Sequence, residues 1–200
     1  KLEVQAQRAG RIVRRVHDFV RKREPRFAEV DLIALVADLA GFVAPEARKA
    51  GVDVELDLPD APAIVTADRV LLEQVVFNLV RNAMEAMATT PARMRRLDIR
   101  VDRRPHTETG LDTAPPTDAI VVEVADRGPG IPPDIAERLF SPFFSTKAEG
   151  MGMGLNICRS IVELHQGRLE FSARPEGGTL FTLMLPARTP DTAPSSEAPA

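Results

Sequence analysis

A long helix is indicated by the run Asn78-Leu79-Val80-Arg81-Asn82-Ala83-Met84-Glu85-Ala86, within residues 68–87, where apolar side chains recur at helical spacing. Asn78 and Asn82 are four residues apart and therefore share one face of that helix. Apolar residues surround them, and an unpaired buried polar group costs about 1–3 kcal/mol. Two interpretations stay open. The amides bond within the protein, or their carboxamide oxygens bind Mg²⁺, a cation that keeps several waters and bridges phosphates.

Strands and shorter helices flank this helix on both sides. The predicted elements, in chain order, are a strand at 29–32, a helix from the N-cap Asp31 to Lys49, strands at 52–58 and 63–66, the helix at 68–87, strands at 99–101 and 120–125, a short helix opened by Pro132 and Pro133, a helix at 154–165, and strands at 169–173 and 179–185. We expect residues 103–118 to form an extended hairpin loop and Gly167 to be the C′ residue of the helix at 154–165. This order predicts an α+β fold, a two-layer sandwich in which helices cover one face of a mixed sheet.

The composition limits the class of protein. The 200 residues suit one domain with appendages, and a hydrophobic content of 44% is enough for a core. The net charge of −3 argues against a nucleic-acid-binding surface, and no apolar run approaches the roughly 18 residues of a membrane span. The single cysteine, Cys158, excludes a disulfide scaffold. Because an initiator Met and a signal peptide are also absent, we expect a cytoplasmic fragment without membrane contact.

The two ends of the chain differ from its middle. Residues 1–23 predict one coiled-coil-type helix, because apolar residues recur at alternating spacings of four and three. The seam consists of Leu2, Ala6, Ala9, Val13, Val16 and Val20. Such a seam cannot bury itself, so we expect a homodimer through residues 1–23, with Pro25 ending the helix. The Pro- and Ser-rich residues 187–200 predict a disordered tail, which leaves residues 27–186 as the globular domain.

A second motif, Asp126-Arg127-Gly128-Pro129-Gly130, directly follows a predicted buried strand. An aspartate in this place can accept a hydrogen bond from an exocyclic amine, and the glycines allow the backbone to approach a flat ligand. An ordinary tight turn explains an isolated motif of this kind equally well.

Two further motifs follow in the chain. Phe140-Ser141-Pro142-Phe143-Phe144-Ser145-Thr146-Lys147 combines aromatic residues that can anchor a mobile lid with a lysine that can meet a phosphate. A core-plugging loop with an exposed lysine is the alternative. Gly150-Met151-Gly152-Met153-Gly154-Leu155 then opens a helix, whose free N–H groups and dipole favour phosphate. A hinge or a helix cap would account for these glycines as well.

The order of the four motifs is more specific than any one of them. Asn82 precedes Asp126 by 44 residues, and Asp126 precedes Gly152 by 26. In this order they resemble the N, G1, F and G2 boxes of sensor histidine kinase catalytic domains, in the gyrase, chaperone, histidine kinase and mismatch-repair ATPase superfamily. Gly177-Gly178-Thr179 is similar to the closing G3 element. The resemblance covers about residues 27–186 and implies an ATP-binding domain of a two-component signalling system.

Three sequence segments resemble most closely those of the nitrogen-regulation, oxygen-sensing and C4-dicarboxylate sensor kinases. They are NLVRNAMEAM at 78–87, PFFSTKAEGMGMGLNICRSIVELHQGRL at 142–169 and EGGTLFTLMLP at 176–186. RAGRIVRRVHDFV at 8–20 is similar to the second helix of their dimerisation bundle, so residues 1–26 would be part of that bundle and a linker. The resemblance implies transfer of the γ-phosphoryl group of ATP to a histidine of the dimerisation domain, and a response regulator as a further partner.

The resemblance also implies roles for single residues. Asn82 would bind Mg²⁺, Asn78 would assist at the phosphates, and Asp126 would bind the adenine amine. The other implied nucleotide contacts are Gly128 and Gly130 at the base, Phe140, Gly152, Gly154 and Leu155 at the lid and phosphates, and Thr179 as an indirect partner of adenine. Many relatives carry a basic residue three positions after the Mg²⁺-binding asparagine. Glu85 stands there in this chain, so Lys147 is our candidate for neutralising phosphate charge.

The three histidines do not fit the acceptor of such a reaction. His17 lies in the helix similar to the second bundle helix, His106 in the polar loop and His165 near a helix end, so we expect the acceptor upstream of Lys1. Two other function classes were weighed. ATP hydrolases of this superfamily carry a glutamate base four residues before the Mg²⁺-binding asparagine, where this chain has Asn78. A module that has lost ATP is disfavoured by the intact motifs.

Overall fold

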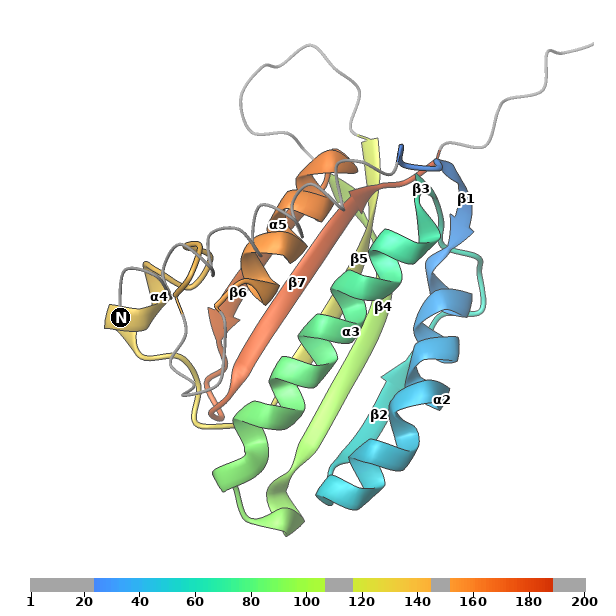
Figure 1. The fold of residues 1–200 in the computed structure, drawn as a ribbon. Helices are drawn as coiled ribbons and strands as arrows, with labels where there is room; N and C mark the ends of the chain where they lie inside the picture. The colour runs from blue at the N-terminus through green and yellow to red at the C-terminus, as the bar shows by residue number, and fades with distance from the viewer. Residues whose placement is uncertain (1–23, 107–116, 145–151, 189–200) are drawn as a thin grey trace, which may run out of the picture.

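The computed structural model describes residues 24–106, 117–144 and 152–188 (Figure 1). Its helices are α2 (Leu32–Ala50), α3 (Arg69–Ala86), α4 (Pro133–Ala136) and α5 (Gly154–Leu164), with 3-10 turns at Met87–Thr89 and Ala92–Met94. Its strands are β1 (Ala28–Asp31), β2 (Asp53–Asp57), β3 (Ile64–Ala67), β4 (Arg96–His106), β5 (Thr117–Asp126), β6 (Arg168–Ala173) and β7 (Thr179–Pro186). The predictions for the helix at 1–23, for Lys147 and for residues 189–200 lie outside the described residues.

Five strands form one mixed sheet in the order β2-β4-β5-β7-β6. β2 and β4 are parallel, and the other neighbouring strands are antiparallel. β1 and β3 form a separate antiparallel pair. α2, α3 and α5 cover one face of the large sheet, with α3 between the other two (Figure 1). The predicted two-layer α+β sandwich is therefore confirmed. Within the described ranges, no helix has both the length and the apolar character needed to cross a membrane.

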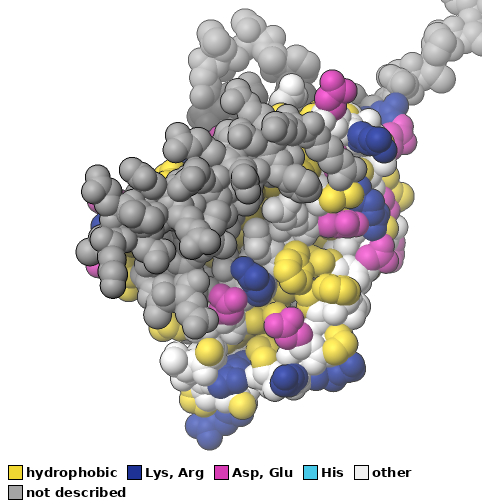
Figure 2. Space-filling model, viewed as in Figure 1, with side chains coloured by type: hydrophobic (Ala, Val, Ile, Leu, Met, Phe, Trp, Pro, Cys, Tyr) yellow, Lys and Arg dark blue, Asp and Glu magenta, His cyan; other side chains and the backbone are white. Residues whose placement is uncertain are grey.

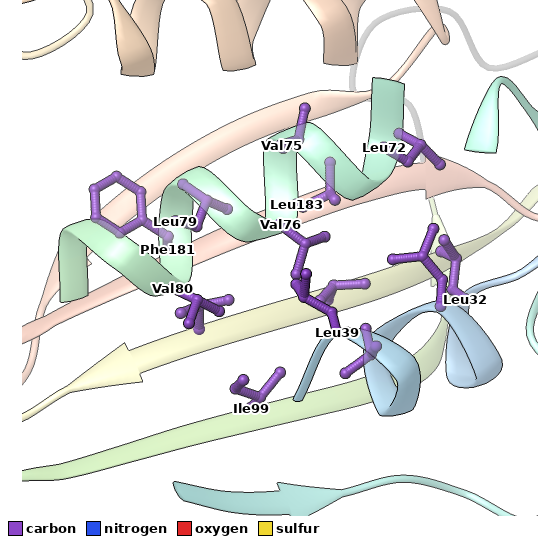
Figure 3. Packing of buried hydrophobic residues seen from close by; sticks show 14 of the residues in the cluster. Leu32, Leu39, Leu72, Val75, Val76, Leu79, Val80, Ile99, Phe181 and Leu183 are labelled. Atoms are coloured by element: carbon purple, nitrogen blue, oxygen red, sulfur yellow. The ribbon is translucent and has the colours of Figure 1, made fainter. Parts of the chain in front are cut away.

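The core lies between α3 and the sheet. The inward face of α3 is fully buried and meets α2 on one side and β4, β5 and β7 beneath (Figure 3). The residues of this contact include Leu72, Val76, Leu79, Val80, Ile99, Phe181 and Leu183. Burying an aliphatic or aromatic side chain of this size stabilises a fold by about 1.5–3 kcal/mol. The helix that carries Asn78 and Asn82 is thus held firmly from below.

Local signals fix where the first two long helices begin. Asp31 is the N-cap of α2 and accepts a hydrogen bond from the N–H of Ile33 at 3.0 Å. Asp68 is the N-cap of α3, and its Oδ1 accepts from Val70 and Leu71. Aspartate is favoured at an N-cap because its carboxylate satisfies free N–H groups and complements the helix dipole. The predicted starts of both helices are therefore confirmed.

Figure 2 shows the helix-bearing face, where hydrophobic side chains gather among acidic and basic ones. Phe42 of α2 is 73% exposed, and its ring lies 6.1 Å from that of Phe77 on α3. Arg69 pairs with Asp38 and Glu73 on the same face. The outer surface of the two helices is therefore mixed rather than uniformly polar.

Three predictions about element ends were wrong. β4 continues to His106 and β5 begins at Thr117, so both ends of the expected loop at 103–118 are strand; the register pairs Arg104 with Ala119. The polar side chains there are tolerated because they lie at the edge of the domain. At the other end, the N–H groups of Ala187 and Arg188 donate to Asp118 and Ile64, so the folded part passes residue 186.

The end of α5 also differs from the prediction. Gln166, not Gly167, takes the left-handed C′ position, with φ 57°. Gln166 and Gly167 donate to the carbonyls of Glu163 and Val162, the bond pattern of a Schellman motif. Glycine is still required at 167, because a Cβ there would lie 2.4 Å from the carbonyl oxygen of Met184. The glycine signal in the sequence thus reflects close packing against β7 rather than helix termination.

His165 joins the ends of two helices. Its Nδ1 lies 2.7 Å from the carbonyl oxygen of Ile161, and its Nε2 accepts the N–H of Asp68 at 3.0 Å. In this pairing Nε2 accepts one hydrogen bond and Nδ1 donates another to the Ile161 carbonyl oxygen. Phe27 packs on the ring, with centroids 5.2 Å apart. The residues just before β1 are therefore fixed to α3 and α5.

The sheet face opposite the helices is charged along β4. Arg96, Asp98, Arg100, Asp102 and Arg104 alternate with the buried Leu97, Ile99 and Val101. Ion pairs cross to neighbouring strands, from Arg100 to Asp57 of β2 at 2.6 Å and from Arg104 to Glu123 of β5 at 2.8 Å. Exposed pairs of this kind contribute only about 0–1 kcal/mol each. Their main effect is to keep this face polar.

Candidate functional site

Asp126 lies at the end of β5 and is 2% exposed. Its Oδ1 accepts the N–H of Gly128 at 2.7 Å and the N–H of Thr179 at 3.3 Å. Burial raises the pKa of the carboxyl group, while these two hydrogen bonds and the charge of Arg174 oppose that rise. The structure thus brings together three of the residues predicted for the base site: Asp126, Gly128 and Thr179.

The backbone packs closely around Asp126. A Cβ on Gly128 would lie 2.9 Å from Asp126 Oδ1 and 3.2 Å from the carbonyl oxygen of Ala86. Gly178 has φ 98°, and a Cβ there would lie 2.1 Å from the carbonyl oxygen of Asp126. No other residue fits these two positions without displacing the carboxylate or its strand. Gly130 approaches Gly178 from the facing loop, which completes a wall made of main chain.

Asn78 and Asn82 lie on one partly exposed face of α3. Asn78 Nδ2 donates to the sulfur of Cys158 on α5 at 3.6 Å, and the thiol lies 3.9 Å from the carbonyl oxygen of Val75. Burial raises the pKa of Cys158 to about 12, so the sulfur stays a neutral thiol. Cys158 is fully buried at the α3–α5 interface, where its sulfur also supports the side chain of Asn78.

The N-terminus of α5 adjoins these amides. A Cβ on Gly154 would lie 3.9 Å from the carboxamide of Asn78. Met153, the N-cap, offers no side-chain hydrogen bond to the first turn. Gly152 has φ 64°, and a Cβ there would lie 2.5 Å from the carbonyl oxygen of Phe144. The first turn of α5 therefore presents backbone N–H groups beside Asn78, an arrangement that suits an anion; Leu155 in this turn is half-buried.

Phe140 packs between α5 and β6. Its ring packs against Phe171 of β6 at 5.8 Å, and the guanidinium of Arg159 lies over it at 5.3 Å. Its carbonyl oxygen accepts a hydrogen bond from Asn156 at 3.0 Å. These contacts anchor the start of the predicted lid to α5 and β6. They identify Phe140 as an anchor and direct its ring to β6.

Glu85 and Lys147 are the two charged positions that the sequence analysis considered near the amides of Asn78 and Asn82. Glu85 pairs with Arg81 one turn earlier, with 3.5 Å between Oε1 and Nε. Lys147 lies outside the described residues. Among those residues, no group of three or more His, Cys, Asp or Glu side chains could hold a metal ion. A cation here would therefore depend on a carboxamide oxygen and on the ligand's own phosphates, which is a donor set that Mg²⁺ accepts.

Sequence analysis missed one residue beside Asp126. Arg174, between β6 and β7, donates from Nη1 to the main-chain carbonyl oxygen of Asp126 at 3.0 Å. It is 48 residues away in the chain, so no local pattern connects the two. Only the strand order, which places β7 between β5 and β6, reveals the contact.

Several solved structures similar to this one are histidine kinases. The catalytic domain of histidine kinase ThkA is 31% identical, with a TM-score of 0.66, and the match covers 81% of this chain and 96% of that domain. ThkA in complex with response regulator protein TrrA gives a TM-score of 0.68 at 28% identity, over 92% of this chain and 48% of that one. These likenesses define the class of protein: an ATP-binding catalytic domain of the histidine kinase type.

The chain belongs to the family described as histidine kinase-, DNA gyrase B-, and HSP90-like ATPases, whose pattern matches residues 67–189. Curated relatives are sensor kinases. C4-dicarboxylate transport sensor protein DctS of Rhodobacter capsulatus is 47% identical over 186 residues, covering 93% of this chain and 26% of that protein. Sensor protein FixL of Bradyrhizobium diazoefficiens is 39% identical over 183 residues, covering 92% and 34%. The chain thus spans between a quarter and about a third of these two relatives.

Proposed function

We propose that this domain binds Mg·ATP and transfers the γ-phosphoryl group to a histidine of a dimerisation domain that precedes it in the parent protein. In this proposal Asp126 accepts a hydrogen bond from the adenine amine on Oδ2, since both backbone N–H groups fall on Oδ1. Thr179 acts indirectly, by orienting that carboxylate. Gly128 and Gly130 leave room for the base.

The phosphates would lie between α3 and the first turn of α5. Asn82 would hold Mg²⁺ through its carboxamide oxygen, and the ion supplies charge neutralisation at the transferred group. Gly152, Gly154 and Leu155 would present backbone N–H groups to the phosphates, with Lys147 as an added cation. Phe140 would anchor the lid. Phosphoryl transfer has a loose transition state, so positioning by these residues is the main requirement.

The observation that favours a kinase over a hydrolase is Asn78. It lies one turn before Asn82, where hydrolases of this superfamily place a glutamate base. A carboxamide has no proton-accepting state near neutral pH. Its contact with the neutral thiol of Cys158 gives it no basic partner either. The side chain can orient a group but cannot activate water.

The proposal includes partners and location. A homodimer would form through residues 1–23, and the phosphohistidine would serve a response regulator, as the ThkA–TrrA complex illustrates for that kinase. We place the domain in the cytoplasm, with no role for nucleic acid or membrane contact in this part of the protein. The folded unit would extend from residue 27 through β7 to Arg188.

The test is phosphoryl transfer in trans. The chain is mixed with Mg·ATP labelled at the γ-position and with the dimerisation domain from the parent protein. We expect acid-labile label on that domain, slowly, because tethering normally supplies a high effective concentration. A dimerisation domain whose acceptor histidine is replaced by glutamine is the control. Release of phosphate without labelled protein would support the hydrolase, and label on this chain would direct attention to His17.

A further inference from the structure

We propose that Arg174 is a positioning residue for adenine recognition, because it fixes the end of β5 from which the Asp126 carboxylate meets the base. The inference rests on the proposed function, which places adenine at Asp126. It adds a residue from outside every motif, located in the connection between β6 and β7.

The first argument is a gap in the sheet. The pairing of β5 with β7 ends at Ala125 and Leu180, so the main chain of Asp126 lies beyond the last pair. Gly178, with φ 98°, lies against the Asp126 carbonyl and turns the start of β7 away from it. The guanidinium of Arg174 donates to that carbonyl at 3.0 Å, where a strand partner would otherwise do so. A buried carbonyl without a donor would cost free energy and loosen the strand end.

The second argument is that Arg174 is itself held on several sides. Its Nη1 lies 3.5 Å from Asp98 Oδ2 on β4, and its side chain is 18% exposed. Its main-chain N–H donates to Gly178, and its carbonyl accepts from Gly177. One residue therefore connects β4, the end of β5 and the turn that leads into Thr179. A planar guanidinium with several donors is suited to such a bridge, whereas lysine offers a single point charge.

The third argument is electrostatic. Adenine recognition is strongest with Asp126 in its charged form, since a carboxylate is a stronger acceptor for an amine than a protonated carboxyl group is. Burial raises the pKa of Asp126, and the positive charge of Arg174 opposes this rise. The other charged groups near this strand end include Asp98 of β4, which pairs with both Arg174 and Arg96, and Arg127, which follows Asp126 in the chain, while α3 approaches through the main chain of Ala86. Without Arg174, the carboxylate would take up its proton at a higher pH, and binding would be lost sooner as the pH falls.

The experiment measures binding of ADP and of IDP, which carries an oxygen in place of the amine, to the 200-residue chain by calorimetry across a pH series. The ratio of the two affinities isolates the contact with Asp126, because phosphate titration affects both ligands. We expect Arg174→Met to lower the ADP-over-IDP ratio by about five- to tenfold, comparable to one hydrogen bond. As the pH is lowered, we also expect the ratio to begin to fall at a higher pH in Arg174→Met than in the wild type.

Two matched variants separate this role from general destabilisation. Arg168→Met removes an exposed arginine from the other end of β6 and should leave the ratio unchanged. Arg174→Lys keeps the charge, so its pH profile should stay near the wild type although the ratio falls. If Arg174→Met does not fold, Asp98→Asn serves as the second probe and should lower the ratio to a smaller extent.

The outcomes are distinguishable. A wild-type ratio and pH profile in folded Arg174→Met, or in both Arg174→Lys and Asp98→Asn, would overturn the positioning role while leaving adenine at Asp126. Equal changes in Arg174→Met and Arg168→Met would overturn it too, because they would indicate loss of stability alone. Equal affinity of the wild-type chain for ADP and IDP would remove the adenine site itself, and with it both proposals.

Discussion

The two ends of the candidate site differ in the groups that form them, mainly main-chain groups at the proposed base end and side chains at the proposed phosphate end. At the base end, main-chain groups surround one carboxylate: Asp126 accepts two backbone N–H bonds and is enclosed by glycines. At the phosphate end, side chains on α3 face the first turn of α5, and Asn78 bonds only weakly to a thiol. The base end is therefore rigid and depends on a single side chain, whereas the phosphate end depends on the relative position of two helices.

The largest effect should come from Asp126→Ala. The base contact is shared by all adenine nucleotides, so ADP and ATP should weaken together, by about 10- to 100-fold for a lost hydrogen bond to a charged group. Calorimetry with both nucleotides measures this. Asp102→Ala removes an exposed carboxylate of β4 and is the control. A loss confined to ATP would contradict the division of the site into base and phosphate ends.

A more selective loss is expected from Asn82→Ala. Removing the carboxamide should weaken Mg·ATP by about tenfold, while ADP without Mg²⁺ is little affected, because the contact acts through the metal. Alanine is favoured inside a helix, so the free energy of unfolding should hardly change. Gln74→Ala removes an exposed amide from the same helix as a control. Equal affinity for Mg·ATP in variant and wild type would exclude Asn82 from the metal site.

The smallest effect, and the sharpest test of kinase against hydrolase, is expected from Asn78→Glu. A glutamate there occupies the position of the general base, a role worth roughly 10²–10⁴-fold where the geometry is right. We expect a rise in ATP hydrolysis well below that range, since Cys158 and its neighbours do not orient a water. Rates are compared at saturating Mg·ATP, because the added charge repels phosphate.

Gln74→Glu places the same charge one turn earlier on an exposed position of α3 and should leave hydrolysis unchanged. If saturated turnover of folded Asn78→Glu does not exceed the wild type, the argument from the base position fails. The kinase assignment would then rest on the relatives alone.

Sequence predicted the fold where the signals were local. Asp31 and Asp68 marked helix starts, and apolar residues at helical spacing marked α3, because caps and periodicity act over a few residues. The ends of the β4–β5 hairpin were missed, since the main-chain pairing that makes its polar residues strand lies between the two strands. Gly167 was predicted to end the helix at 154–165. Glycine is required there for a different reason, because a Cβ would meet the carbonyl oxygen of Met184 on β7.

The candidate site shows the same division. The motif residues Asp126, Gly128 and Thr179 do come together, although 53 residues separate Asp126 from Thr179. The resemblance supplied that grouping, because local pattern carries no information on it. Arg174 belongs to no motif and could not be found without the strand order. The contact between Asn78 and Cys158, 80 residues apart, is equally invisible in the sequence.

The row of charged side chains along β4 affects how readily copies of the domain associate in solution. A sheet with helices on one face leaves the other face open to solvent, and an exposed apolar face of that kind tends to associate with other molecules. Alternating Arg and Asp side chains, already paired with neighbours such as Asp57 and Glu123, hold water over that face. A second sheet would have to strip that hydration shell before making contact. Copies of the domain can therefore come close together without this face becoming an apolar contact surface.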